Sequence, residues 1–185
     1  VNDIKEKTIP ELNEDFFKDL GMEGVDSKEA LEKQLEENLS VSKEAENENI
    51  YIDMLLEAAS KNVEVDIPEE MIDEEINRMI NRYAEQLKMQ GIDINKYYEL
   101  TNTNEEQLKV QMKSEASKHV LYRLMLEEIA KKEQLEITDE EAKEEATRLA
   151  KQYQMEEEEF LKLFGGLEMI KYDLEMRKTI EILKK

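Results

Sequence analysis

Residues 63–89 of this 185-residue chain read VEVDIPEEMIDEEINRMINRYAEQLKM. They combine a short connector with an amphipathic helix, and this combination determines the fold. Apolar and acidic residues alternate up to Pro68, and the residue before a proline avoids helical angles, so residues 63–67 are predicted to form a short extended connector. Pro68 itself suits the first turn of a helix. Beyond it, apolar side chains recur every three or four positions, at Ile72, Ile76, Met79, Tyr83 and Leu87. This spacing predicts an amphipathic helix from Glu69 to about Met89, ended by Gly91.

The same arrangement occurs a second time, 70 residues further along the chain. Leu135-Glu136-Ile137 matches Val65-Asp66-Ile67, and Thr138 then begins a helix predicted to reach about Tyr153. The acidic residues of the two helices keep one register, in which Glu145 corresponds to Glu75. Glu-rich helices can match by chance, but the shared connector and cap argue for an internal repeat.

The remaining segments also have helical patterns. Ser27 is predicted to begin a helix that no Gly or Pro interrupts before Lys61, and Asn104 a helix that reaches about Glu133. Shorter helices are predicted over residues 12–20, 93–100, 156–164 and 167–183. The chain has only 5 Gly and 2 Pro residues, which is too few for a turn-rich β fold.

We therefore expect an all-α fold in which long helices form an elongated body and two helical arms protrude from it. The two longest helices would measure about 45–50 Å, whereas a compact chain of this size is about 40 Å across. The expected body comprises residues 11–62, 104–134 and 167–185, the first arm residues 63–103, and the second arm residues 135–166. Residues 1–10 are interpreted as the end of a preceding domain and a linker, with Val1 to Lys5 as its last strand, so the chain is expected to be a fragment.

The charge of the chain excludes several classes of function. Asp and Glu number 47 against 26 Lys and Arg, which gives a formal net charge of -21. Such a surface repels phosphate backbones, so we expect no nucleic-acid partner. No apolar run approaches the roughly 20 residues of a membrane helix, so we expect no membrane partner either. The absence of cysteine excludes disulfides and thiolate metal sites and fits a cytoplasmic protein.

No motif for catalysis or metal binding is recognisable. His119 is the single histidine, and it lacks the Glu-x-x-His and His-Glu-x-x-His spacings that build metal sites on helices. The runs of acidic residues lack the Asp-x-Asp-x-Asp-Gly loop that binds calcium, so we interpret them as solvated helix faces. Glycine-rich phosphate loops and nucleophile motifs are also missing. We therefore expect this segment to have no enzymatic activity, no cofactor and no metal.

Methionine and aromatic residues indicate a peptide-binding surface on the arms. Methionine is flexible and polarisable, which suits a surface that accepts varied apolar partners. Because protruding helices have few neighbours, we expect at least one open apolar patch there, although the stripes could instead pack arm helix on arm helix. The predicted contact residues are Met71, Ile72, Ile76, Met79, Ile80, Tyr83, Leu87, Met89, Tyr97, Phe160, Leu163 and Phe164.

Taken together, these segments resemble the C-terminal domain of trigger factor, a family of bacterial chaperones of nascent chains. The resemblance covers essentially the whole chain and rests on the order and spacing of four stretches. These are Ile9 to Phe16 with Leu20-Gly21, the helix start from Ser27 to Glu37, Val63 to Ile72, and Gln134 to Glu141. The helical parts of periplasmic parvulin-type chaperones are similar and form the main alternative.

The resemblance implies a domain that cradles unfolded or nascent polypeptides without ATP. The family's ribosome-docking Gly-Phe-Arg-x-Gly-x-x-Pro loop does not occur in this sequence, so a ribosome contact is expected only through an N-terminal domain that the sequence does not contain. Prolyl isomerisation is likewise expected of the parent protein and not of this segment. A different class of function also fits the stripes, namely a helical scaffold that binds one folded partner or associates with itself through the arms.

Overall fold

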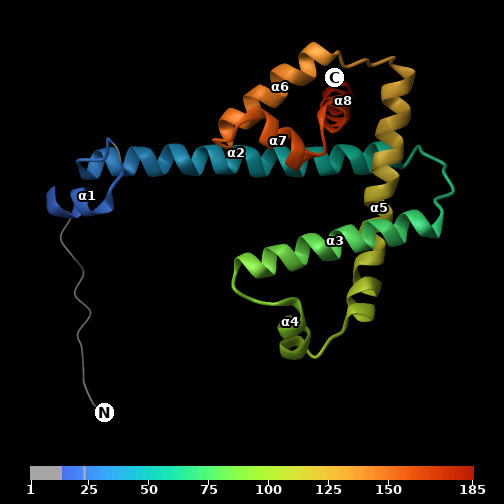
Figure 1. The fold of residues 1–185 in the computed structure, drawn as a ribbon, viewed down its shortest axis with the longest axis horizontal. Helices are drawn as coiled ribbons and strands as arrows, with labels where there is room; N and C mark the ends of the chain where they lie inside the picture. Colours follow the sequence, from blue (N-terminus) through green and yellow to red (C-terminus); the bar gives the residue numbers. More distant parts are fainter. Residues whose placement is uncertain (1–13, 23) are drawn as a thin grey trace. The chain divides into compact units, whose positions relative to one another are not determined.

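A computed structural model describes residues 14–22 and 24–185 of the chain (Figure 1). Its helices are α1 (Glu14–Leu20), α2 (Lys28–Ser60), α3 (Glu69–Met89), α4 (Ile94–Thr101), α5 (Glu105–Lys132), α6 (Asp139–Gln152), α7 (Glu157–Phe164) and α8 (Leu167–Leu183). Within the described ranges there is no strand, which confirms the all-α class. The strand expected over residues 1–5 and the linker up to residue 10 lie outside the described residues.

The chain divides into two compact units, residues 1–53 and 54–185, with the boundary inside α2. In the first unit Phe17 and Val25 are buried, and the rings of Phe16 and Phe17 meet edge to face at 5.5 Å. Ser27 begins α2 as predicted, because its Oγ accepts the N–H of Ala30 at 3.2 Å. Most α2 residues up to Asp53 are exposed to solvent, including the apolar Leu39.

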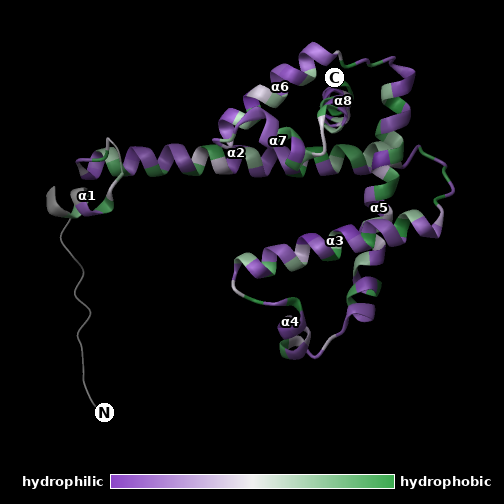
Figure 2. Cartoon of the chain, viewed as in Figure 1, coloured by the Kyte–Doolittle hydropathy of each residue, from purple (hydrophilic) through white to green (hydrophobic). Residues whose placement is uncertain are grey.

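The second unit contains two groups of three helices. We call them the α3 group, made of α3, α4 and the first part of α5, and the α6 group, made of α6, α7 and α8. In each group the first helix packs mainly on the third, α3 on α5 and α6 on α8, and α5 also contacts α8. Hydrophobic and hydrophilic residues are interleaved along every helix, as amphipathic helices require (Figure 2).

The apolar stripe of α3 forms the core of the α3 group. Ile72, Ile76 and Ile80 are buried against Leu108 and Ala116 of α5. A second layer of partly buried residues surrounds them, including Met79, Tyr83, Tyr98 and Met112. The stripe predicted for residues 69–89 therefore faces α5 over most of its length. The grouping of residues 11–62 with 104–134 and 167–185 into a body crosses the boundary between the two units and stays a prediction.

The α6 group has its core in the same register. Its buried residues on α6 are Ala142, Ala146 and Ala150, each 70 positions after a buried isoleucine of α3. Here the first helix carries the small side chains, and the large ones come from Phe160 of α7 and Ile170 of α8. The predicted 70-residue repeat is thus confirmed in the packing, with alanines on α6 at the positions where α3 carries isoleucines.

The ends of several helices follow the capping signals of the sequence, and two do not. Asn104 Oδ1 accepts the N–H of Gln107 at 2.9 Å, and Thr138 forms a capping box with Glu141. Gly91 has a φ of 78° after α3, as expected for a helix-ending glycine. Gln134 and Gln154 adopt the same left-handed conformation after α5 and α6, with φ of 52° and 55°. Glutamine has no preference for this conformation, so the sequence did not indicate it.

Truncating one residue of the α3 stripe tests this core. We expect Ile76→Ala to lower the free energy of unfolding by about 2–5 kcal/mol, because it leaves a cavity between α3 and α5. Val110→Ala on the exposed side of α5 is the matched control and should change it by no more than about 0.5 kcal/mol. Urea unfolding followed by circular dichroism measures both, and equal effects would contradict the packing described here.

Candidate functional site

Two glutamates at equivalent positions of the repeat connect the helices of each group. Glu75 Oε2 lies 3.0 Å from Arg78 Nε, and its Oε1 lies 3.3 Å from both Arg82 Nη2 and His119 Nδ1 of α5. Glu145 Oε1 lies 2.7 Å from Arg148 Nη2 and 2.6 Å from Arg177 Nη2 of α8. Both carboxylates are largely shielded from water, with 12% and 11% of the side chain exposed. Each therefore links an acidic helix to the helix on which it packs.

The pKa shifts in the α6 group have a structural origin. Hydrogen bonds from Arg148 and Arg177 lower the pKa of Glu145 to about 2. Lys178 and the backbone N–H of Thr138 lower the pKa of Glu141 to about 2 as well. Burial and a hydrogen bond to Glu127 raise the pKa of Tyr172 to about 12. All three groups move away from neutral pH, which favours a role in stability over one in proton transfer.

The predicted contact residues occupy three different environments. Ile72, Ile76, Ile80, Leu87 and Phe160 are buried. Met71, Met79, Tyr83 and Tyr97 are partly buried. Met89, Leu163 and Phe164 are exposed, with Met89 at 84%. The client-binding role of all twelve stays a prediction, and the exposed three are the ones that a partner can reach without any rearrangement of the helices.

Exposed leucines recur at equivalent points of the two groups. Leu100 on α4 is 71% exposed and Leu163 on α7 is 73% exposed. Each of these short helices packs an aromatic ring against a tyrosine, at 5.3 Å between Tyr97 and Tyr83 and at 6.0 Å between Phe160 and Tyr153. The exposed apolar positions that sequence reasoning missed in this unit are Met54, Val65, Leu100, Val110 and Met169.

The signal that could have found Leu100 is the repeat itself. The helix α6 has 14 residues and α3 has 21, so the offset between equivalent residues falls from 70 to 63 beyond these helices. With that offset Asp93 corresponds to Glu156, the N-cap of α7, and Leu100 corresponds to Leu163. An apolar residue predicted for contact on the second arm thus has a direct counterpart on the first.

A groove with apolar walls lies beside the first connector, within residues 54–185. It has a volume of about 530 Å³ and is formed by the end of α2, the connector and one face of α5. Its apolar lining residues are Ala59, Val63, Val65, Leu124, Met125 and Ile129. Asn62, Glu64, Glu128 and Lys132 complete the lining with polar groups. A groove of this size can hold one or two apolar side chains of a peptide.

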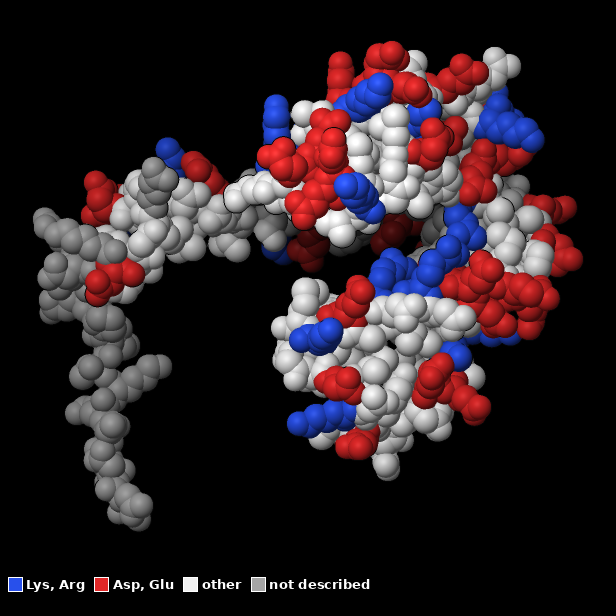
Figure 3. Space-filling model, viewed as in Figure 1, with Lys and Arg blue, Asp and Glu red and all other residues white. Residues whose placement is uncertain are grey.

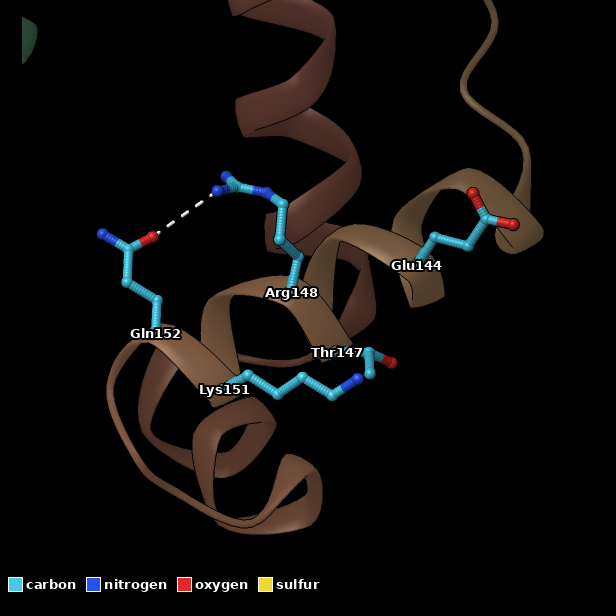
Figure 4. Close-up of a pocket in the computed structure, with 5 residues that line it drawn as sticks. All are labelled: Glu144, Thr147, Arg148, Lys151 and Gln152. Atoms are coloured by element: carbon cyan, nitrogen blue, oxygen red, sulfur yellow. Dashed lines mark hydrogen bonds between the residues drawn. The ribbon is translucent and has the colours of Figure 1, made fainter.

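A second depression is formed by α6 alone. The side chains of Glu144, Thr147, Arg148, Lys151 and Gln152 lie along one face of the helix, and Arg148 Nη1 donates to Gln152 Oε1 at 3.4 Å (Figure 4). All five come from a single helix, so no second wall encloses a ligand. We regard it as ordinary polar surface.

The part of the chain that the structure describes has neither a metal-binding cluster nor a membrane-spanning helix. Among residues 14–22 and 24–185, no group of three or more His, Cys, Asp or Glu side chains is placed to hold a metal ion. Over the same residues, no helix combines the length and the hydropathy needed to span a bilayer.

Comparison with known proteins assigns the chain to a family. Residues 27–185 match the family model described as the C-terminus of bacterial trigger factor protein. The chain belongs to the trigger factor family. A trigger factor from Geobacillus sp. (strain WCH70) is 40% identical over 183 residues, which are 99% of this chain and 42% of that protein. One from Halalkalibacterium halodurans is 38% identical over 186 residues, 99% of this chain and 43% of that protein.

The chain therefore spans less than half the length of the trigger factors that it matches. A solved structure of trigger factor domains from Thermotoga maritima also matches, with a TM-score of 0.52 and 23% identity. The match covers 71% of this chain and 78% of that one. This similarity supports the fold, and the resemblance to the trigger factor C-terminal domain is confirmed.

The shielded glutamate of the α6 group makes a prediction about acid stability. The pKa of Glu145 is below its ordinary value of 4.5, so its contribution is complete above about pH 4.5 and is lost as the pH falls toward 2. We expect Glu145→Gln to lower the free energy of unfolding at pH 7 and to make much less difference near pH 2. Urea unfolding at both pH values measures this.

Glu144→Gln is the matched control, because Glu144 is the exposed neighbour of Glu145 on the same helix. It should have little effect at either pH. A Glu145→Gln penalty of equal size at pH 7 and pH 2 would show that the ion pairs with Arg148 and Arg177 are not its cause.

Proposed function

We propose that this chain is a chaperone domain that binds exposed apolar segments of unfolded or nascent polypeptides without ATP and so limits their aggregation. The observation that carries the proposal is the pair of equivalent leucines, Leu100 and Leu163, each more than two-thirds exposed on a short helix. Single exposed leucines are common on protein surfaces. Two at the same point of a repeated architecture, in a chain of the trigger factor family, favour a shared binding role.

The size of the apolar surface fits weak and reversible binding. Burying one leucine or methionine contributes about 1.5–3 kcal/mol before the cost of ordering the client is subtracted. A client that covers Leu100, Leu163 and Met89 therefore gains only a few kcal/mol of binding free energy. Such a client can leave again without ATP, as a chaperone of this kind requires.

The surrounding charge supports the same function. Acidic side chains are distributed over much of the visible face of residues 54–185, with basic ones between them (Figure 3). The net charge of -21 opposes the association of client-loaded molecules and favours the binding of basic clients. Apolar side chains can thus stay exposed at useful concentrations without causing precipitation.

For the longer parent protein we make a separate proposal, which rests on the family and not on the structure of this segment. We expect the longer parent to act on nascent chains in the cytoplasm, to contact the ribosome through another domain and to isomerise prolyl bonds. For this segment we propose binding without catalysis.

Replacing the two leucines tests the proposal. We expect Leu100→Glu combined with Leu163→Glu to raise, by roughly tenfold, the concentration needed to suppress aggregation of a denatured protein, because two apolar contacts are lost. Light scattering of a protein diluted from denaturant measures this when each variant is added over a range of concentrations that includes the equimolar ratio. The matched control is Gln107→Glu combined with Gln111→Glu, which adds the same charge at exposed positions of α5.

Equal suppression by the leucine and glutamine variants would contradict the contact assignment, and failure of the unaltered chain to suppress scattering would contradict the function. The scaffold alternative predicts a different result. If the same leucines bind a second copy of the chain, the chain should not bind a panel of unrelated unfolded peptides. It should instead dimerise with increasing concentration in analytical ultracentrifugation.

A further inference from the structure

Three of the five arginines of this acidic chain line one small pocket. Arg78 and Arg82 come from α3 and Arg123 from α5, and Asn81 and Glu75 complete the lining. The pocket has a volume of about 440 Å³. Basic side chains gather on the visible face where α3 and α5 cross (Figure 3). Positive charge is therefore concentrated at one point of a chain whose net charge is -21.

The ion pairs inside the pocket leave positive charge uncompensated. Glu75 is the single carboxylate of the lining, and it accepts from Arg78 and Arg82. Arg123 forms no ion pair with any carboxylate of the described residues. Glu127, one turn further along α5, accepts from the hydroxyl of Tyr172 at 2.7 Å. The lining thus carries three guanidinium groups against one carboxylate.

The α6 group shows that the fold does not require the additional positive charge found in the α3 group. Lys113 on α5 pairs with Glu69 of α3, and Lys171 on α8 pairs with Asp139 of α6, so equivalent residues of α5 and α8 are 58 positions apart. In this register Arg123 corresponds to Glu181, which pairs with Lys184 at 2.6 Å. Arg82 corresponds to Gln152 in the register of α3 and α6.

Among the described residues, the ion pairs of Glu145 in the α6 group are those with Arg148 and Arg177. The same architecture is therefore built there without counterparts of Arg82 and Arg123. Arg82 pairs with Glu75 in the α3 group, whereas Arg123 has no ion pair among the described residues that would explain its position.

We propose that the pocket formed by Arg78, Arg82 and Arg123 binds the carboxylates of acidic segments in client polypeptides. A guanidinium group donates two parallel hydrogen bonds to a carboxylate, and a pair of such contacts at adjacent arginines recognises one or two acidic side chains. The inference rests on the proposed chaperone function and adds a class of client segment to it. The general acidic surface attracts basic segments, and this pocket accepts acidic residues that the rest of the surface repels.

A peptide fits the pocket better than a nucleic acid does. The phosphate backbone of a nucleic acid extends over many charges, and the surrounding acidic surface repels all those outside the pocket. One or two carboxylates on an otherwise apolar peptide need only a local positive site. The pocket volume of about 440 Å³ is sufficient for one or two carboxylate side chains.

Two fluorescent peptides test the proposal with the full chain. Both have the same apolar residues, and they differ only in a central pair that is Glu-Glu in one and Gln-Gln in the other. Fluorescence anisotropy measures their dissociation constants for the unaltered chain, for Arg82→Gln combined with Arg123→Gln, and for Lys143→Gln combined with Lys151→Gln. The lysine variant is the matched control, because it removes the same charge from exposed positions of α6.

We expect the arginine variant to weaken binding of the Glu-Glu peptide about tenfold, the loss of one or two charge-assisted hydrogen bonds, and to leave the Gln-Gln peptide unchanged. The lysine variant should weaken binding of the Glu-Glu peptide much less. Added salt should reduce the difference between the dissociation constants of the two peptides. Arg123→Lys keeps the positive charge but cannot donate two parallel hydrogen bonds to one carboxylate. We therefore expect it to weaken binding of the Glu-Glu peptide only partly, in a chain that remains folded.

Each outcome separates this inference from the function on which it rests. If both peptides bind equally to all variants, the carboxylate site is wrong and the chaperone proposal stands. If neither peptide binds the unaltered chain, the chaperone proposal itself fails. If inorganic phosphate or ATP at low millimolar concentration displaces the Glu-Glu peptide, the pocket is a phosphate site and the peptide proposal is overturned.

Discussion

Each acidic helix of residues 54–185 depends on burying a single apolar stripe against one partner helix. Between the buried positions of α3 and α6 lie exposed charged residues such as Asp73, Glu74 and Glu144, so only one side of each helix can be removed from water. That side meets α5 in one group and α8 in the other. The connectors, the caps and the short helices α4 and α7 hold α3 and α6 in the positions in which these two stripes are buried.

The polar contacts reinforce this arrangement at its edges. Glu75 and Glu145 lie where the stripe meets solvent. Each contacts a side-chain nitrogen of the partner helix, from His119 or Arg177, as well as an arginine of its own helix. A shielded carboxylate without such partners would cost several kcal/mol. The repeat therefore preserves the glutamate and its first arginine, whereas the residues around them have diverged into a histidine in one group and an arginine in the other.

Much of this fold could be predicted from the sequence because helix boundaries depend on local chemistry. Asn104, Thr138 and Gly91 begin or end helices through bonds and angles within a few residues, as predicted. Pro68 was predicted in the first turn of α3 and instead precedes it as the N-cap. Gln134 and Gln154 could not be predicted, since they adopt a left-handed angle without the residue type that favours it. The hydrogen bond from the N–H of Leu135 to the carbonyl of Ala130 stabilises that angle at Gln134.

The sequence by itself determined the class of the fold, the repeat and the family, because periodicity, caps and connectors are local and their order along the chain is specific. Only the tertiary structure decided which apolar residues face a neighbour and which face water. Ile76 and Leu163 both lie on amphipathic helices, yet α5 covers the first and nothing among the described residues covers the second. The arginine pocket was hidden for the same reason: Arg82 and Arg123 are 41 positions apart in the chain, and the crossing of α3 and α5 alone brings them together.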